Sequence, residues 1–466
     1  MPRSIGNFSP LFPEPLSTIL AQFDRSVASF RGALLLAFLS AWAGGCASAD
    51  AVVGTPAHDY WSPTELRMED HVYSPTIHTV QLFKKGFELA PPIIDLNGED
   101  VLVLRFDDLQ PNVENLTYTV VHCDANWQPS DLINGQYLSG AMNDYVPAGR
   151  LSYNTLQPFI QYEVEVPNGM MRITRSGNYL LKVYRDSDAS DLVLTRRFMV
   201  FEQEVRIDAR VMASRNVELR DVAQQVDITL RHDRLPVQDP FADIHITVLQ
   251  NMRWDDARTG FRPRFVRGTE LVYDFPEQGL FMGNNEYRNF DLKDLRFITP
   301  RVARITPGLG EGVYEAWLLP EVKRNIRVYF DQPDINGRFL VRNDLVDGDP
   351  LGADYARVHF SLPMSAPLMD PVHVYGGFSD FRCRKEYRMV WSEENKAYEA
   401  TALLKQGFYD FTYVTLPAGA TVPDLAAIEG SHFQTENDYV VLVYFTDRQQ
   451  RCDRLVGVRF LNSRRG

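Results

Sequence analysis

The sequence contains little cysteine and no excess of basic residues. It has four cysteines in 466 residues, and 48 Lys and Arg against 61 Asp and Glu, for a net charge of −13. Nucleic-acid binding needs a basic surface, so this balance argues against nucleic acid as a partner. Cys123, Cys383 and Cys452 have no CxxC spacing, which indicates neither a zinc site nor a redox motif. They can form at most one bridge, either Cys383–Cys452 or none, with buried free thiols.

Catalytic and nucleotide-binding motifs are also missing. The chain has no P-loop, no G-x-G-x-x-G after a strand, no G-x-S-x-G and no H-E-x-x-H. Its nine histidines are scattered. We therefore expect a protein that is not an enzyme and has no cofactor and no metal.

The one apolar run near the N-terminus, Ala33 to Trp42, is too short to span a bilayer and follows Arg31. This pattern is typical of a secretory signal, so we expect residues 1–45 to be a signal region and 46–69 a linker. The sequence "AGGC" ending at Cys46 resembles a bacterial lipoprotein cleavage site, which would place a lipid on Cys46. The alternative is ordinary signal cleavage nearby. Either way we expect a periplasmic protein, associated with the outer membrane if it is lipidated.

What the chain does have is aromatic residues, 12% of the total, and short alternating segments. "QYEVEV" at 161–166 alternates polar and apolar residues as a half-buried strand does. Tyr179–Glu202 is predicted to be a hairpin with a turn at Asp186–Asp191. Strands at this spacing predict an all-β protein made of three consecutive β-sandwich, immunoglobulin-like domains. The predicted ranges are 70–202, 203–352 and 353–466.

The last range has a second pattern. It resembles early-set immunoglobulin-like modules of glycogen-branching enzymes at Val372, Val374, Gly377, Phe378, Gly407, Tyr409 and Phe411. This resemblance implies an early-set-like sandwich for the C-terminal domain.

In the middle range, "DING" at Asp334–Gly337 is expected to be a tight turn between two alternating runs.

The segment "HCDANWQPSDL", His122 to Leu132, is the densest group of chemically active residue types. On a strand, His122 and Asp124 point to one face and Cys123 to the other. His122 and Asp124 could bind a metal, but two ligands are too few for a metal site and no third is suggested nearby. We therefore interpret the segment as the end of a core strand followed by a turn in which Trp127 caps the sandwich.

Two arginine- and aromatic-rich stretches are candidates for a protein interface, because such residues are enriched there. They are 250–265 and 284–297. The alternative is that they brace ordinary long loops. The candidate interface residues are Arg253, Trp254, Arg258, Phe261, Arg262, Tyr287 and Arg288.

Six segments in the same order resemble the plug protein of the Bacteroidetes type IX secretion system. They are "VHCDANWQPSDL", "SGNYLLKVYRDSD", "LVLTRRFMVFE", "VLQNMRWDDA", "NNEYRNFDLKDLRF" and "LKQGFYDFTYV" with "EGSHFQTENDYVVLVYF". The resemblance implies a non-enzymatic, all-β periplasmic protein. It would seal the periplasmic side of a large outer-membrane β-barrel translocon when no cargo is present. No catalytic residues come with it.

Two other functions remain open. The first is a periplasmic or surface carbohydrate-binding lipoprotein that uses Trp391, Phe378 and Phe381 of the C-terminal sandwich. The second is a hydrolase built around His122 and Asp124. It predicts a pocket in which these two side chains meet a further acid or nucleophile.

Overall fold

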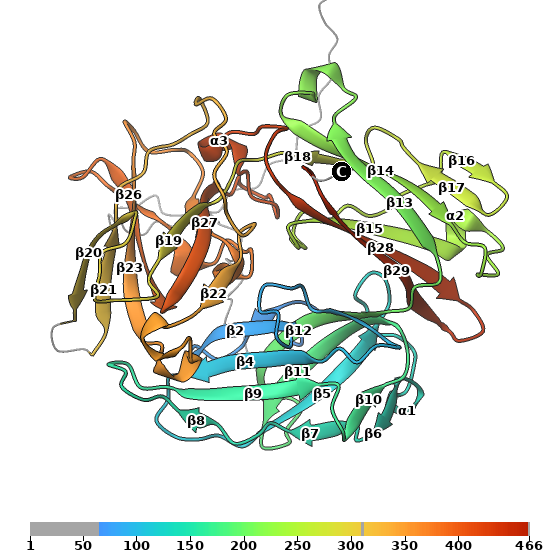
Figure 1. Cartoon of the computed structure of the whole chain (residues 1–466), viewed down its shortest axis with the longest axis horizontal. Coiled ribbons are helices and arrows are strands. Elements are labelled where there is room, and N and C mark those ends of the chain that lie inside the picture. Colours follow the sequence, from blue (N-terminus) through green and yellow to red (C-terminus); the bar gives the residue numbers. More distant parts are fainter. Residues whose placement is uncertain (1–64, 309–311, 465–466) are drawn as a thin grey trace, which may run out of the picture. The chain divides into compact units, whose positions relative to one another are not determined.

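A computed structural model describes residues 65–308 and 312–464 of the chain. Nearly all regular structure in these residues is β, in several mostly antiparallel sheets (Figure 1). This confirms the predicted all-β class, whereas the immunoglobulin-like detail stays a prediction. The signal region 1–45, the lipidation candidate Cys46 and most of the 46–69 linker lie outside the described residues.

The first group of sheets is built from one continuous stretch of chain. One sheet has the order β1-β12-β11-β5-β7 with β3 beside β12, the other has the order β2-β4-β9-β8, and β6 pairs with β10. Leu104, Val120 and Tyr179 are among the buried side chains between them, which form the first core. Its elements are β1 (His71–Val72), β2 (Ile77–Lys84), β3 (Ile93–Asp95), β4 (Leu102–Asp108), β5 (Leu116–Cys123), α1 (Asn134–Tyr137), β6 (Leu138–Gly140), β7 (Asn143–Tyr145), β8 (Arg150–Leu151), β9 (Ile160–Val166), β10 (Met171–Ile173), β11 (Gly177–Arg185) and β12 (Leu192–Phe201).

Local sequence patterns explain this first group well. In β9, the apolar members Tyr162, Val164 and Val166 are each 1% exposed, as the alternation predicts. β11 and β12 form the predicted antiparallel hairpin, with Tyr179 opposite Phe198. The two rings stack with centroids 5.2 Å apart.

The second group joins two separate stretches of chain. One sheet has the order β13-β14-β17-β16 with β18 beside β14, and the other has the order β15-β28-β29. Val226, Ile246 and Val441 belong to the second core between them. Its elements are β13 (Arg206–Ala213), η1 (Val217–Leu219), β14 (Ala223–Arg231), α2 (Pro240–Asp243), β15 (Ile244–Gln250), β16 (Phe265–Arg267), β17 (Glu270–Tyr273), β18 (Leu280–Met282), β28 (Asp438–Asp447) and β29 (Cys452–Asn462).

The third group comes from the chain between these two stretches. One sheet has the order β20-β21-β23-β26-β25, and in the other β27 pairs with β19, β22 and β24. Phe290, Val358 and Phe411 belong to the third core. Its elements are β19 (Arg288–Asp291), β20 (Val302–Pro307), β21 (Tyr314–Leu318), β22 (Phe339–Val341), η2 (Asp344–Val346), η3 (Pro350–Gly352), β23 (Tyr355–Pro363), β24 (Val372–Tyr375), η4 (Gly377–Ser379), η5 (Lys385–Tyr387), β25 (Val390–Ser392), β26 (Ala397–Lys405), β27 (Gly407–Thr415) and α3 (Ala426–Glu429).

A fourth cluster of buried residues lies between the first and second groups. Leu180 of the first group packs with Leu442 and Leu455 of the second, and we name this cluster the bridging core. The Tyr444 hydroxyl donates to Asn178 Oδ1 at 2.8 Å within it. The β5-β11-β12 sheet therefore has one face in the first core and the other in the bridging core.

The sheets also show how the chain passes between groups. β28 pairs with β15 along seven residue pairs, from Ile244–Phe445 to Gln250–Tyr439. In Figure 1 the red strands β28 and β29 accordingly lie beside green-yellow β15. The predicted ranges 203–352 and 353–466 stay predictions as domain limits, but β28 and β29 complete the second core, and 286–430 supplies the third.

One predicted pair of strands is only partly present. Asn336 and Gly337 have φ of 56° and 78°, so the expected tight turn exists. β22 follows it, but no strand precedes it, because residues 323–335 form no ladder with another strand. The expectation of two alternating strands around this turn was wrong on its N-terminal side.

Candidate functional site: the charged junction between the cores

His122 is the last-but-one residue of β5 and is 1% exposed. Its Nδ1 lies 2.9 Å from Ser130 Oγ, and its Nε2 lies 3.2 Å from the Ser176 carbonyl oxygen. Burial lowers the pKa of His122 to about 4, so the ring is neutral at neutral pH. Its ring packs edge-on against Tyr179. These contacts give His122 a packing role at the edge of the first core.

Asp124 shapes the turn that follows. Its Oδ1 accepts the N–H groups of Asn126 and Gln128, both at 2.8 Å. This turn carries Trp127 in the left-handed region, at φ 63°, which is uncommon for a large side chain. Asp124 therefore holds the backbone that presents Trp127, and its Oδ1 is occupied by these two N–H groups. The described residues contain no group of three or more His, Cys, Asp or Glu that could hold a metal ion.

Trp127 is part of a cation–aromatic stack that joins the first and second groups. The Arg197 guanidinium lies 4.3 Å from the Trp127 ring centroid and 5.2 Å from that of Trp254. The two indoles meet edge to face at 5.0 Å. Arg197 Nε also donates to the Met68 carbonyl at 2.8 Å. A guanidinium this close to two indole rings is attracted to both, so this stack fixes β12 against the loop after β15.

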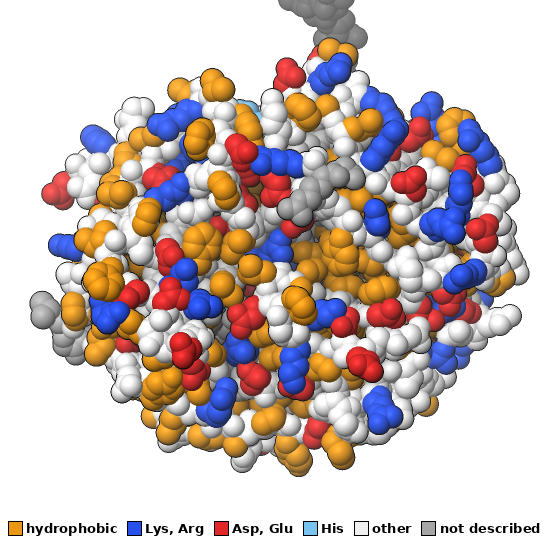
Figure 2. Space-filling model, in the orientation of Figure 1, with side chains coloured by type: hydrophobic (Ala, Val, Ile, Leu, Met, Phe, Trp, Pro, Cys, Tyr) orange, Lys and Arg blue, Asp and Glu red, His pale blue; other side chains and the backbone are white. Residues whose placement is uncertain are grey.

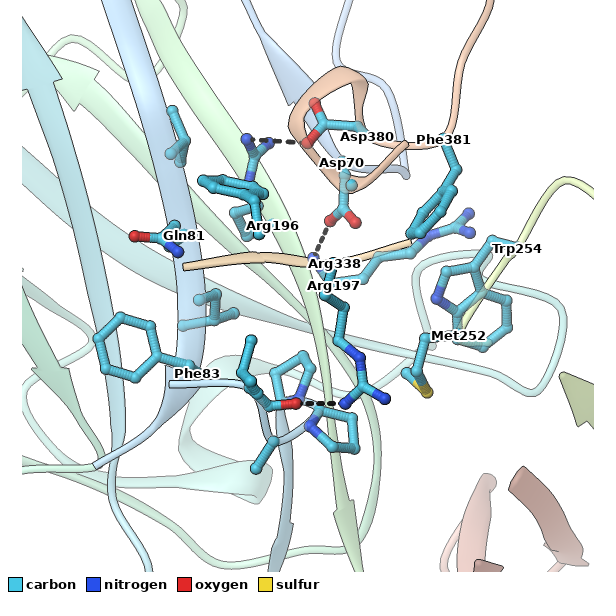
Figure 3. Close-up of a pocket in the computed structure, with 18 of the residues that line it drawn as sticks. Asp70, Gln81, Phe83, Arg196, Arg197, Met252, Trp254, Arg338, Asp380 and Phe381 are labelled. Carbon is cyan, nitrogen blue, oxygen red and sulfur yellow. Dashed lines mark hydrogen bonds and ion pairs between the residues drawn. The ribbon is translucent and has the colours of Figure 1, made fainter. Parts of the chain in front are cut away.

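A cavity of about 190 Å³ lies beside this stack, and all three groups contribute to its wall (Figure 3). Asp70 and Arg196 come from the first group, Met252 and Trp254 from the second, and Asp380 from the third. In Figure 3, Arg196 points toward Asp380 and the Asp70 carboxylate toward the backbone of Arg197. The cavity thus marks the place where the three groups meet.

Ion pairs between groups form the wall of this cavity. Arg196 is 5% exposed, lies 3.4 Å from Asp380, and donates to the Thr195 carbonyl at 2.9 Å. Asp70 Oδ1 accepts the Arg197 N–H at 2.6 Å. Burial raises the pKa of Asp70; nearby Arg196 lowers it and Asp380 raises it. Arg382 pairs with Glu69 at 2.7 Å in the same way across the first and third groups.

Arg338 connects all three groups by itself. It lies just after the Asp334–Gly337 turn of the third group. Its Nη1 donates to the Leu89 carbonyl of the first group at 2.5 Å, and its Nη2 pairs with Asp438 of the second at 2.6 Å. The turn is held by Asp410 Oδ2, which accepts the N–H groups of Ile335 at 2.6 Å and Gly337 at 3.1 Å.

A buried ion pair links the first and third groups on another side. Lys405 Nζ lies 2.6 Å from Asp107 Oδ2, and both side chains are 1% exposed. The Tyr355 hydroxyl donates to the same oxygen at 2.7 Å, and Gln161 donates to Asp107 Oδ1 at 3.1 Å. Lys405 Nζ also lies 3.8 Å from the Phe159 ring centroid. Burial lowers the pKa of Lys405, while Asp107 opposes the shift. A buried charge pair is tolerated because these hydrogen bonds complete it.

The predicted interface residues divide into buried and accessible sets. Arg253, Phe261, Tyr287 and Arg288 are 2%, 6%, 5% and 1% exposed. They brace the chain from within: Arg253, for example, pairs with Asp255 at 2.9 Å. Trp254 and Arg258 are half-buried, and Arg262 is exposed. Only these last three can reach another protein in this structure, and their role at an interface stays a prediction.

Arg288, the first residue of β19, carries a buried charge. Its Nε and Nη2 bond the two carboxylate oxygens of Glu429 at 2.9 and 3.0 Å. Arg324 Nε bonds Glu429 Oε2 at 2.6 Å. Burial alone would raise the pKa of Glu429, but Arg324 and Arg288 outweigh it and hold that pKa at about 2. Arg288 and Glu429 thus anchor α3 to β19.

The cysteines and the candidate sugar-binding aromatics also have internal roles. Cys123, Cys383 and Cys452 are free thiols, so the Cys383–Cys452 bridge is not formed. Burial raises their pKa values to about 12, 12 and 11, which keeps them protonated.

Trp391, Phe378 and Phe381 are half-buried. Each meets a tyrosine edge-on, with ring centroids 5.3 to 5.6 Å apart. No observation favours the carbohydrate-binding alternative over the plug.

The functional residues that sequence reasoning missed are the connectors Arg338, Arg196, Asp107 and Lys405. The only signal for them was local. Asp107 ends an apolar strand and Lys405 follows "TALL", positions where a charge is unexpected in a core. Asp107 and Lys405 are separated by 298 positions, and no short-range pattern links them.

The chain is similar to a known protein family and to a known crystal structure. Residues 77–202 match the family model described as "Type 9 secretion system plug protein 1st domain". The chain is also similar to the crystal structure of a hypothetical protein from Parabacteroides merdae, with 29% identity and a TM-score of 0.81. That similarity covers 85% of this chain and 100% of the other. No curated protein matches the sequence. None of the helices within 65–308 and 312–464 is long and apolar enough to cross a membrane.

Proposed function

Because this chain belongs, through residues 77–202, to the type 9 secretion system plug family, we propose that it is the plug of a type 9 secretion translocon. In this role it sits in the periplasm and seals the periplasmic side of a large outer-membrane β-barrel. It acts by occupying space and by its surface, with no chemistry of its own. The match over residues 77–202 is the observation that carries the proposal.

The connections between the cores support such a role. A body that closes a wide aqueous lumen has to keep its shape, so its parts should not move against one another. Interfaces within a chain are otherwise often small and mobile. Here the bridging core, Arg338 and the Lys405–Asp107 pair tie the groups together. These contacts between the groups favour a protein that behaves as a single rigid body.

The surface charge supports a seal that can also be released. The chain carries a net charge of −13, and acidic and basic side chains are interspersed over the face drawn in Figure 2. Polar interfaces with few anchors separate more readily than large apolar ones. An acidic body also associates with a basic or mixed rim at rates that fall with salt. Both properties suit a plug that leaves when cargo arrives.

Two experiments test the proposal. The full chain, with a C-terminal tag, is purified from the native envelope in mild detergent, and we expect mass spectrometry to identify a large outer-membrane β-barrel in the eluate. A tagged unrelated periplasmic protein is the control. Deleting the gene should also make the outer membrane permeable to vancomycin, which is too large for ordinary pores. A protein that recovers no barrel, and whose deletion leaves the barrier intact, contradicts the proposal.

A further inference from the structure

The segment between β21 and β22 exposes an unusual amount of apolar surface. Ile326, Val328 and Phe330 are 85%, 91% and 76% exposed, and we name these three residues the apolar ridge. Single exposed apolar residues are common on soluble proteins, but three alternating ones in five positions form a contiguous patch. Such a patch indicates a contact that the isolated chain does not make.

The ridge is held in place from its inner side. The Tyr329 hydroxyl bonds Glu286, and its ring lies 5.5 Å from that of His432. The Asn325 N–H donates to the Ile428 carbonyl at 3.0 Å just before the ridge. Tyr329 thus faces the protein while Val328 and Phe330 face away, as on an extended chain, and Ile326 lies in the turn just before them. The apolar side chains are presented by an anchored segment.

The backbone of the ridge is open as well. Within residues 65–308 and 312–464, the N–H groups of Val328 to Gln332 donate no hydrogen bond to another residue. Exposed, extended backbone with free N–H groups is a template for pairing with another chain. The hydrocarbon region of a bilayer cannot satisfy such groups, so the ridge would not bury its backbone there. Free amides beside apolar side chains therefore favour a polypeptide partner.

The charged residues beside the ridge indicate which charge its partner should carry. Lys323 and Arg327 make no ion pair with the described chain. The nearest carboxylate within the segment, Asp331, is already paired with Arg464 at 2.9 Å. A second copy of this chain that paired ridge to ridge would therefore not bring an unpaired Asp331 to Arg327. The fitting partner has alternating apolar side chains and its own acidic residues.

We propose that the apolar ridge pairs, by strand addition, with an extended, acidic and alternately apolar segment of the translocon barrel. This rests on the proposed function, because it names the surface by which the plug would hold its barrel. Main-chain hydrogen bonds supply affinity, and pockets for Ile326, Val328 and Phe330 supply specificity. Val328 and Phe330 are the anchors, since both are exposed apolar side chains on the stretch of backbone whose N–H groups are free.

The test compares two charge-matched variants of the tagged full chain in the envelope purification. Val328→Asp/Phe330→Asp places two charges in the ridge. Val217→Asp/Met369→Asp places two charges at residues that are 83% and 103% exposed elsewhere. We expect the ridge variant to recover at least about tenfold less barrel, since anchor residues each contribute 2 kcal/mol or more, and the control to equal the unaltered protein. Equal thermal unfolding temperatures of the three proteins show that neither variant is misfolded.

The charge requirement is tested separately. Lys323→Glu/Arg327→Glu should reduce barrel recovery about tenfold as well, because it sets like charges against the acidic partner. Full recovery by the ridge variant overturns the strand-addition proposal while leaving the plug function in place. If the unaltered protein recovers no barrel, both fail. A dimer by light scattering that the ridge variant abolishes, or ridge-dependent flotation with phosphatidylethanolamine–phosphatidylglycerol vesicles, would also overturn it, in favour of a second copy or a membrane.

Discussion

The first and second cores are both closed by two sheets, but they are assembled in different ways. The first core uses strands from one continuous stretch, including the β11–β12 hairpin. The second core joins strands before residue 283 to β28 and β29, which follow the whole third core. The first core can therefore form from neighbouring residues, whereas the second needs the third group to bring its two parts together. Removing strands tests this contrast directly, and three substitutions test the contacts that stabilise and join the groups, from the largest expected effect to the smallest.

Removing β28 and β29 should affect the two cores very differently. In a chain ending at Glu436, β15 loses its partner strand, and the second and bridging cores lose Val441 and Leu442. We expect the second group to unfold while the first stays folded, because no strand of the first group is deleted. Limited chymotrypsin digestion, with the fragments identified by mass, should leave the region 70–202 protected. Protection of 203–283 in the truncated chain would contradict the contrast.

Lys405→Met should destabilise the tie between the first and third groups. The substitution leaves the Asp107 carboxylate buried without its cation, which costs about 3–5 kcal/mol. Urea unfolding followed by fluorescence measures the loss. Lys396→Met, which breaks an exposed pair with Glu393, is the control and should change the free energy of unfolding by less than about 1 kcal/mol. Adding Asp107→Leu to Lys405→Met should restore much of the loss; if it does not, the buried charge is not its cause.

The Asp334–Asp410 pair should make stability depend on pH. Burial raises the pKa of Asp334 to about 7 and that of Asp410 to about 8. The nearby Glu286 and Glu436 also raise the pKa of Asp334, and the Asp334 charge raises that of Asp410. In the unfolded chain both ionise near pH 4, so between about pH 4 and pH 8 the folded protein binds more protons. This pair therefore contributes stability that is fully present below about pH 4 and is lost as the pH rises toward 8.

Asp410→Asn isolates this contribution, because it keeps an acceptor for Ile335 and Gly337 but cannot ionise. We expect the decline in the free energy of unfolding between pH 5.5 and pH 8.5 to become shallower by about 1–2 kcal/mol, a discounted conversion of the raised pKa values. Urea titrations at three pH values measure it. An unchanged slope would show that another group titrates in this window.

Arg197→Lys should have the smallest effect. Lysine keeps a charge beside Trp127 and Trp254 but loses the broad guanidinium that lies near both rings and donates to the Met68 carbonyl. The expected loss is about 1 kcal/mol, with the melting temperature lowered by a few degrees at most. Differential scanning calorimetry detects it. A loss larger than that of Lys405→Met would reverse the proposed order of the two ties.

The sequence predicted what depends on neighbouring residues. The alternation in β9, the β11–β12 hairpin and the turn after His122 were all predicted correctly from local patterns. It could not predict which strand β28 joins, because every apolar strand has the same pattern whatever its partner.

The sequence also did not predict which charged side chains are buried. Arg288 was expected near the surface, since a charged residue in a loop-like stretch is usually exposed. The structure buries it against Glu429, a residue 141 positions away. Lys405 and Asp107 lie in strands, where a charge is unexpected, but no short-range pattern points to the counterion of either. Only the fold brings the two charges together.

The return of the chain into the second core also sets an order of assembly. As the polypeptide leaves the ribosome or an export channel, the first group has all its strands early, while the β15 edge waits for the final strands to arrive. Until then that edge carries Ile244 to Gln250 without the strand that covers it in the finished protein. Nascent or truncated chains would therefore be open at one defined place to proteases and to sticking together.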